Sequence, residues 1–216
     1  MATAQHLLDV ARSQLGVHED PPKSNSTPYG RWYGMDGQAW CAMFASWCLA
    51  QVGVHDWKHA YTPTGYQMFR NAGRLHFKGA QPGDLVYFDF PGDAVHRISH
   101  VGFVESVNPD GTVNTIEGNT NAAGSRTGGN VLRHRRDPIV HGIRGYGRPD
   151  YDPPEDDDMT DEERWVLADL WVRSCYERRA KTDPGFVVRE EDVKYWIGRV
   201  VGRNTSFGGA AEAIAG

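Results

Sequence analysis

The chain has 216 residues, of which 39% are apolar and 24% are charged, and its formal net charge is −5. This composition excludes a wholly disordered chain, and the length predicts one domain or one domain with an appendage. No stretch approaches the ~18 apolar residues that a membrane-spanning helix needs. The charge shows no strong basic excess, so we expect no nucleic-acid partner. Three cysteines are too few for a disulfide framework and favour reduced thiols.

The charged residues divide the chain into two parts. Residues 1–150 carry 14 Lys and Arg against 13 Asp and Glu, and they hold all nine histidines. Residues 151–216 carry 9 against 15, so the negative charge is concentrated there. Prolines followed by an acidic run predict an extended linker at 149–159, because proline fixes φ and like charges repel one another. We therefore expect a domain at 1–148 and an appendage at 160–216.

In the larger part, helical patterns come first and strand patterns follow. Apolar residues at helical spacing predict helices at 4–15, 41–52 and 64–71, and the polar stretch at 18–38 predicts a loop. Short apolar runs bounded by turns predict strands at 85–88, 100–107, 112–117, 130–136 and 141–146. Helices followed by strands favour an α+β fold, in which the N-terminal helices pack on an antiparallel sheet.

The C-terminal part predicts a hairpin of two helices at 160–216. Thr160 and Glu163 have the spacing of a capping box, and Leu170 is expected on the apolar face of the first helix. Two such helices have too little core to be stable alone, so we expect them to pack on the first domain or on a partner. A role in self-association stays open.

Cys41 begins the apolar helix at 41–52. The N-terminus of a helix carries partial positive charge and free N–H groups, which favour a thiolate and can hold an oxyanion. His100 begins one predicted strand and Glu117 ends the next, so a hairpin between these strands places the two side chains side by side. A nucleophilic thiol needs a base, and the base needs a polar partner that fixes its tautomer. Cys41, His100 and either Glu117 or Asn119 supply these three roles.

Four short motifs resemble the successive motifs of the CHAP domain, whose name stands for cysteine, histidine-dependent amidohydrolase/peptidase. In chain order they are WCAMF at 40–44, PGDLV at 82–86, SHVG at 99–102 and IEGN at 116–119. Each motif alone is weak, but four of them in the right order are specific. The resemblance covers about residues 4–148.

This resemblance implies a papain-like α+β fold and the cleavage of an amide bond in bacterial peptidoglycan. By the same resemblance Cys41 is the nucleophile, His100 the base, Glu117 the orienting acid and Asn119 a further polar member. The chain looks most like a bacteriophage endolysin, a bacteriolytic enzyme for host lysis. No secretory signal is visible at the N-terminus, so we expect the host cytoplasm as its location before release and the cell wall afterwards. Release would then need a holin-like protein.

Aromatic residues surround Cys41 in the sequence. Trp32, Tyr33 and Trp40 are candidates for a groove that binds the glycan or the stem peptide, whereas Trp47 is expected to pack in the core. Gln38 lies in the loop before Cys41. It is a candidate oxyanion donor, although the sequence favours a solvated or loop-bracing glutamine.

A metal site is not expected. Cys41, Cys48, His55 and His59 have a spacing that invites a zinc site, but the two cysteines lie ~10 Å apart along a helix, too far to share one ion. Cys48 is therefore expected to pack in the core. Calcium stays open, because the loop before Cys41 offers carboxylates but no D-x-D cluster.

The resemblance leaves several functional questions open. An amidase and an endopeptidase would use the same nucleophile, so the scissile bond cannot be derived from these residues. A non-catalytic phage structural or wall-binding protein that keeps the fold is the alternative function. The intact set of Cys41, His100, Glu117 and Asn119 argues against it, because binding alone needs no pair of nucleophile and base. Residues 160–216 could serve in cell-wall targeting or in self-association, and the oligomeric state stays open.

Overall fold

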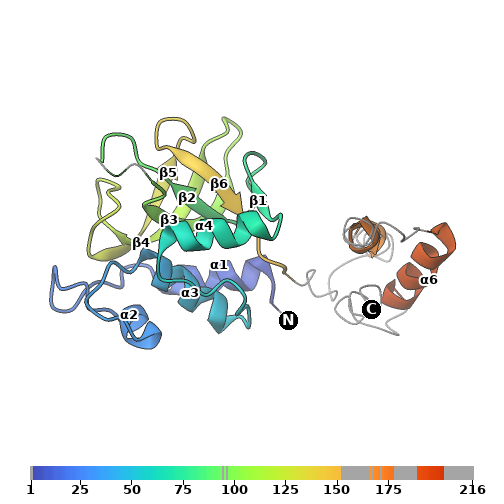
Figure 1. Cartoon of the computed structure of the whole chain (residues 1–216), viewed down its shortest axis with the longest axis horizontal. Coiled ribbons are helices and arrows are strands. Elements are labelled where there is room, and N and C mark those ends of the chain that lie inside the picture. The colour runs from blue at the N-terminus through green and yellow to red at the C-terminus, as the bar shows by residue number, and fades with distance from the viewer. Residues whose placement is uncertain are drawn as a thin grey trace. The chain divides into compact units, whose positions relative to one another are not determined.

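The computed structural model describes residues 2–93, 95, 97–151, 166, 168–170, 172–177 and 189–201. The chain divides into two compact units, Met1–Tyr151 and Asp152–Gly216 (Figure 1). Most of the expected linker at 149–159 lies outside the described residues, and so does the whole capping box of Thr160 and Glu163. Within the described residues, no helix is both long enough and apolar enough to cross a membrane.

The helices of the first unit are α1 (Ala4–Ser13), α2 (Pro28–Tyr33), α3 (Cys41–Gln51) and α4 (Thr62–Asn71). Three of them lie where the apolar periodicity predicts helices. The short helix α2 lies inside the stretch that was expected to be a loop. Thr27 caps it by accepting from the N–H of Gly30, and Gly34 ends it with a left-handed φ of 86°. A helix of six residues is too short to show an apolar period, so only these cap residues could have revealed it.

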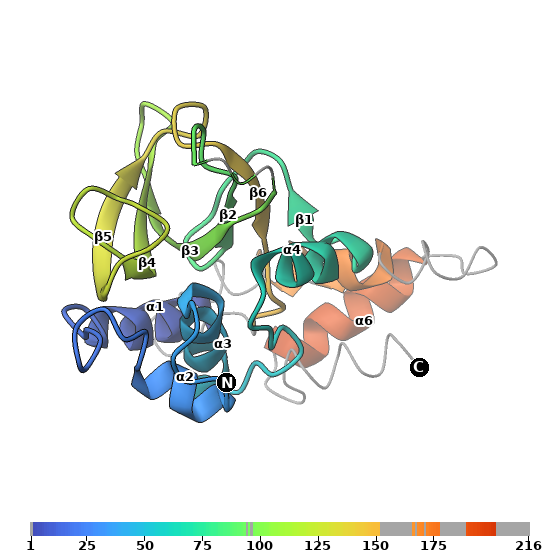
Figure 2. The same cartoon turned by 60° about the vertical axis from the view of Figure 1, so that its left-hand side comes forward.

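The sheet has six antiparallel strands in the order β1-β6-β2-β3-β4-β5. Their bounds are β1 (Leu75–His76), β2 (Leu85–Phe88), β3 (His100–Val107), β4 (Val113–Thr120), β5 (Asn130–Arg136) and β6 (Ile143–Gly147). In Figures 1 and 2, α1 and α3 lie on one side of the sheet, and α4 lies beside β1 and β6. The expected α+β class with helices on an antiparallel sheet is confirmed. The two-residue strand β1 was not expected, and β4 extends to Thr120 instead of ending at Glu117.

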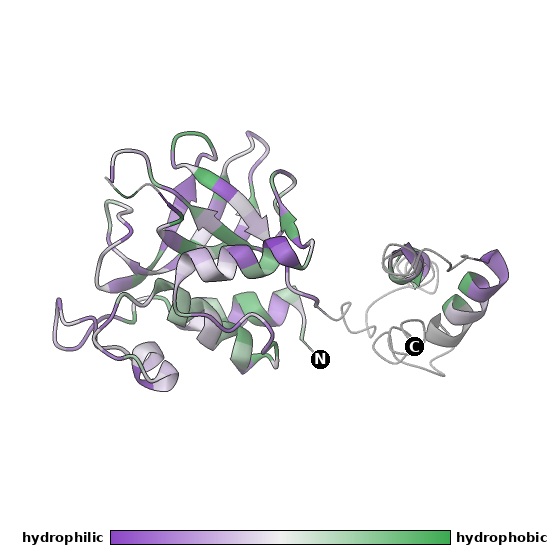
Figure 3. Ribbon diagram, viewed as in Figure 1, coloured by the Kyte–Doolittle hydropathy of each residue, from purple (hydrophilic) through white to green (hydrophobic). Residues whose placement is uncertain are grey.

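The core lies between the sheet and the helices. Alternate strand residues face opposite sides of a sheet, and here one set joins a cluster with α1 and α3: Leu85, Tyr87, Val101, Phe103 and Ile116. The other set forms a smaller cluster on the opposite face: Val86, Phe88, Val104, Val113 and Tyr146. Helix α3 is buried along almost its whole length, and Figure 3 shows its apolar colouring. The sheet and the buried helix α3 therefore give Cys41 a rigid support.

In the second unit, the described helical residues include 172–177 and helix α6 (Glu190–Val201). Ala168, Val172, Val193 and Ile197 are buried there. Leu170, expected on the apolar face, is 60% exposed, because the buried residues at 168, 172 and 175 follow a helical stripe offset from it.

Candidate active site

Cys41 is the first residue of α3, and only 5% of it is exposed. Trp40 precedes the helix and makes no side-chain capping bond, so no side chain of the N-cap residue takes the N–H groups of the first turn. These N–H groups carry the positive end of the helix dipole. The expected placement of a thiol at a helix N-terminus is therefore present in the structure.

His100 and Glu117 form a buried pair beside this helix end. Nε2 of His100 lies 3.0 Å from Oε2 of Glu117, and neither side chain has any solvent exposure. Burial lowers the pKa of His100, but the neighbouring Cys41 and Glu117 outweigh it and raise that pKa to about 9. Nδ1 of His100 is fully enclosed and has no hydrogen-bond partner. Since Glu117 occupies Nε2, Nδ1 is the nitrogen left to serve the Cys41 thiol.

The hairpin of β3 and β4 brings His100 and Glu117 together as the sequence predicts. Phe103 pairs with Ile116 in the register, so the next pair along the strands is Gly102 with Glu117. A β-carbon on Gly102 would lie 2.5 Å from Cγ of Glu117. Because glycine leaves this space free, the Glu117 side chain crosses over the neighbouring strand and reaches His100 diagonally.

Arg136, at the end of β5, holds the other side of Glu117. Its Nε and Nη2 donate to the two oxygens of Glu117 at 2.8 and 2.6 Å, and Thr115 donates to Oε1 at 2.6 Å. Burial raises the pKa of Glu117, but the hydrogen bonds from Arg136 and His100 outweigh it and hold that pKa below its usual range. Glu117 is therefore an ionised, fully buried carboxylate whose charge is shared between an arginine and an imidazole.

The guanidinium of Arg136 also stacks on two aromatic rings. Its Cζ lies 5.4 Å from the ring centre of Phe88 and 5.1 Å from that of Phe90. Arg136 was not among the residues expected at the site. The alternation of β5 and its pairing with β4 place Arg136 on the same face as Glu117, and this was the pattern that could have found it.

Asn119 supports the backbone before the thiol instead of contacting His100. It has a left-handed φ of 57°. With its amide oriented so that both polar atoms are satisfied, the nitrogen donates to the carbonyl of Gly128 at 2.7 Å and the oxygen accepts from the N–H of Trp40 at 3.2 Å. Of the two candidates for the partner of the imidazole, Glu117 is the one bonded to it.

The aromatic residues near Cys41 differ in exposure. Trp40 was expected in a substrate groove, and this expectation is wrong: the residue has no exposed surface, because it stacks on Tyr29 at 5.5 Å and donates its indole N–H to Glu19. Trp32 is 37% exposed, and together with the half-buried Tyr33 it packs under the ammonium group of Lys58. A substrate could reach Trp32 and Tyr33 but not Trp40.

The remaining candidates of the sequence also have defined positions. Gln38 is exposed in the loop before Cys41, and Trp47 is half-buried with its ring 5.3 Å from that of Tyr29. Cys48 is fully buried, and burial raises the pKa of its thiol well above the ordinary value. Among the described residues, no three His, Cys, Asp or Glu side chains come together as metal ligands.

His59 lies in the core with both ring nitrogens near polar atoms. Its Nδ1 donates to the carbonyl of Trp57 at 2.6 Å, and its Nε2 lies 3.5 Å from the hydroxyl of Tyr87. Burial lowers the pKa of His59, so the ring is neutral near pH 7. These contacts make His59 a packing residue rather than a zinc ligand.

Comparison with known proteins identifies the domain that carries this arrangement. The family model of the CHAP domain matches residues 32–119. This segment of the chain is similar to CHAP domains. The matched segment includes Cys41, His100, Glu117 and Asn119, whereas Arg136 lies beyond it.

Two further comparisons add little beyond this family. No curated protein matches the chain. Among solved structures, the endolysin LysIME-EF1 matches with a TM-score of 0.45 at 14% identity, over 70% of this chain and 66% of that one. The match therefore spans just under two thirds of the length of that endolysin, and the similarity is too loose to indicate a function.

Proposed function

We propose that this protein is a cysteine-dependent peptidoglycan hydrolase that cleaves an amide bond of the bacterial cell wall. The observation that supports this most strongly is the buried His100–Glu117 pair beside Cys41 at a helix N-terminus. Burying ionisable groups is costly unless they are paired, and a merely structural domain gains nothing from raising the pKa of an imidazole next to a thiol. The CHAP family supplies the class of substrate.

The first half of the reaction forms an acyl-enzyme. His100 accepts the thiol proton at Nδ1, which gives a thiolate and an imidazolium. The sulfur of Cys41 attacks the carbonyl carbon of the substrate amide, and the carbonyl electrons move onto the oxygen. N–H groups at the start of α3, with Gln38 as a further candidate donor, hold this oxyanion. His100 then gives its proton to the leaving amine as the C–N bond breaks.

The second half of the reaction releases the product. A water molecule attacks the thioester, His100 takes one of its protons, and the C–S bond breaks to restore the Cys41 thiol. Throughout both steps Glu117 keeps the imidazole in one orientation and stabilises its charged form. Arg136 does not contact the substrate in this account. It is a positioning residue, because it fixes the carboxylate of Glu117 through two hydrogen bonds.

Lysis of isolated cell walls tests this proposal with a matched pair of cysteine variants. Cys41→Ala should abolish the loss of turbidity in a wall suspension, while its thermal unfolding stays close to that of the parent protein. Cys48→Ala removes a thiol from the same helix two turns away and should retain lysis. If Cys41→Ala lyses walls as fast as the parent protein, the cysteine mechanism is wrong and the non-catalytic alternative gains support.

A role in host lysis would add a requirement for release. We propose that the enzyme accumulates in the host cytoplasm and reaches the wall through a membrane lesion made by a holin-like protein. Expression of the full chain in the cytoplasm of a susceptible bacterium should leave the cells intact until a membrane-permeabilising agent is added. Lysis without that agent would show that the chain needs no such partner.

A further inference from the structure

A cavity of about 630 Å³ lies next to the proposed catalytic residues. Its lining comes from the segment between His18 and Asn25, from Ala39, from Asn119 near the end of β4, and from residues 127–130 at the start of β5. Asn119 bonds the backbone of Trp40, the residue before Cys41. The cavity therefore reaches Ala39, two residues before the proposed nucleophile, where part of a bound substrate would lie.

Glu19 lies in the wall of this cavity with one oxygen unused. The residue is only 5% exposed, and its Oε1 accepts from the indole N–H of Trp40 at 3.1 Å. Its Oε2 makes no hydrogen bond or ion pair within the described part of the chain. This oxygen is also not enclosed by the protein. Among the described residues, the fully enclosed side-chain polar atom that lacks a hydrogen-bond partner is Nδ1 of His100, so Oε2 of Glu19, which also lacks one, must have an accessible surface. Oε2 of Glu19 therefore faces the cavity.

We propose that Oε2 of Glu19 binds a primary ammonium group of the peptide substrate. A carboxylate that is nine-tenths buried and half unpaired favours a cation that can donate hydrogen bonds. The cavity is also lined by the amides of Asn25, Asn119 and Asn130, which suit a peptide backbone, and by the polar side chains of His18, Lys23 and Thr127. His18 lines the same cavity, but among the described residues Glu19 belongs to no group of three His, Cys, Asp or Glu side chains that could hold a metal ion.

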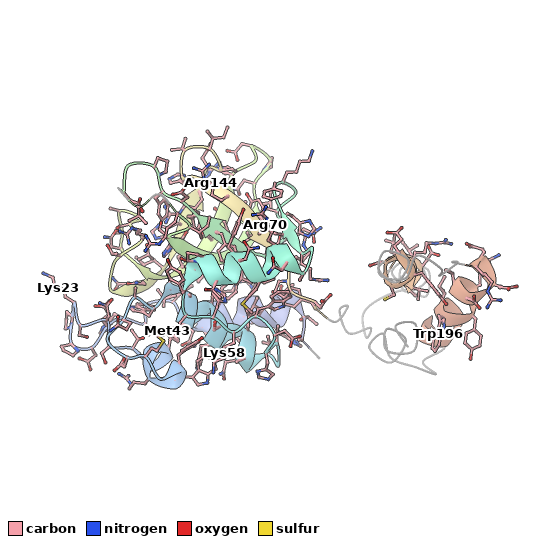
Figure 4. The ribbon with its side chains drawn as sticks, viewed as in Figure 1. Lys23, Met43, Lys58, Arg70, Arg144 and Trp196 are labelled. Carbon is pink, nitrogen blue, oxygen red and sulfur yellow. The ribbon has the colours of Figure 1, made fainter. Side chains whose placement is uncertain are left out.

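The cavity contains one cation of its own, and it does not neutralise Glu19. Lys23 lines the cavity but makes no ion pair with Glu19 among the described residues. Figure 4 shows Lys23 at the outer end of its loop, with the side chain pointing away from the sheet. The negative site at Glu19 therefore stays available to a ligand. This inference rests on the proposed function, because it assigns a part of the peptide substrate to a subsite.

Two sources of the ammonium group fit this chemistry, a diamino-acid side chain and a free peptide N-terminus. Three synthetic stem peptides separate them: one with only the side-chain amine free, one with only the N-terminal amine free, and one with both acetylated. Binding is measured by calorimetry to the full chain carrying Cys41→Ala, so that no turnover occurs. At least one peptide with a free amine should bind about tenfold more tightly than the fully acetylated peptide.

Two further variants test whether Glu19 is responsible. Glu19→Gln, added to Cys41→Ala, keeps an amide oxygen for the Trp40 indole but should remove the preference for the free amine. Asp20→Asn removes the same charge from the exposed neighbouring residue and should keep that preference. In the active enzyme, Glu19→Gln should raise KM about tenfold for the amine-bearing peptide, leave kcat unchanged, and have no effect on the acetylated peptide.

The outcomes separate this inference from the proposed function. Equal binding of all three peptides, or a preference that survives Glu19→Gln, would overturn the inference even if the enzyme hydrolyses walls. An amine preference that depends on Glu19 would support the subsite even if the parent protein cleaved no peptide, in which case only the proposed hydrolase function would fall.

Discussion

Replacement of Glu117 by glutamine separates the charge of this carboxylate from its hydrogen bonds. The amide has nearly the same shape, and its oxygen can still accept from His100 or Arg136. What disappears is a negative charge 3.0 Å from Nε2 of His100, at a place where neither side chain is exposed to solvent. His100 should therefore lose its proton at a lower pH in this variant.

The size of the effect follows from the two kinds of hydrogen bond. A hydrogen bond to a charged group contributes about 1.5–3 kcal/mol and a neutral one about 0.5–1.5 kcal/mol. The difference of about 1–1.5 kcal/mol corresponds to about one pH unit. The pKa of His100, about 9 in the parent protein, should therefore fall toward about 8. Because the leaving amine takes its proton from the imidazolium, the alkaline limb of kcat/KM should move by the same amount.

The assay is a pH profile of wall hydrolysis, together with an NMR titration of the His100 ring. Glu105→Gln is the matched control, because Glu105 lies on the same strand as His100 and pairs with Arg12 and Arg133 at 2.8 Å each. This control should leave the alkaline limb in place. The reasoning is refuted if the limb of Glu117→Gln stays near pH 9, or if Glu105→Gln moves it equally far.

Three other substitutions and one stability profile extend the account. Gly102→Ala places a β-carbon against the side chain of Glu117. It should lower kcat about hundredfold or more and reduce the unfolding free energy by about 1–3 kcal/mol. A variant with parental kcat would contradict the diagonal path of Glu117. Arg136→Gln leaves a buried carboxylate poorly compensated and should cost about 3–5 kcal/mol in chemical denaturation, whereas a cost below about 1 kcal/mol would show that the pair adds little. Gly65→Ala forces a β-carbon into the His59 ring, so thermal unfolding should shift down by several degrees while kcat per folded molecule is unchanged; a large fall in kcat would place His59 in the chemistry. Since folding raises the pKa of His100, its pair with Glu117 stabilises the fold fully below about pH 6.5 and loses this effect as pH rises through about 9, which urea denaturation at several pH values can check.

The sequence predicts the elements that position the thiol and the imidazole. Strand alternation and a four-residue turn at 108–111 are local features, and they were enough to place His100 next to Glu117. Helix α3 was predicted for the same reason, since its apolar run is long and Gly53 follows shortly after it. These parts of the site depend on short-range patterns that a single sequence displays directly.

The residues that were missed or misplaced depend on contacts between distant segments. Arg136 reaches Glu117 from a strand that becomes its neighbour only when the sheet forms. Trp40 was expected at the surface, yet its burial is set by Tyr29 and Glu19, which lie far from it in the sequence. The burial of Trp40 leaves no periodic trace in the sequence, and the alternation of β5 points to Arg136 only once the pairing of β5 with β4 is known.

The most direct test of the central claim is mass spectrometry of purified peptidoglycan digested by the full chain. The account predicts fragments that each gain the mass of one water at an amide bond, with a new amine and a new carboxylate. It also predicts that these fragments are absent after treatment with Cys41→Ala. New reducing sugar ends in place of new amines, or the same amide products from Cys41→Ala, would contradict it.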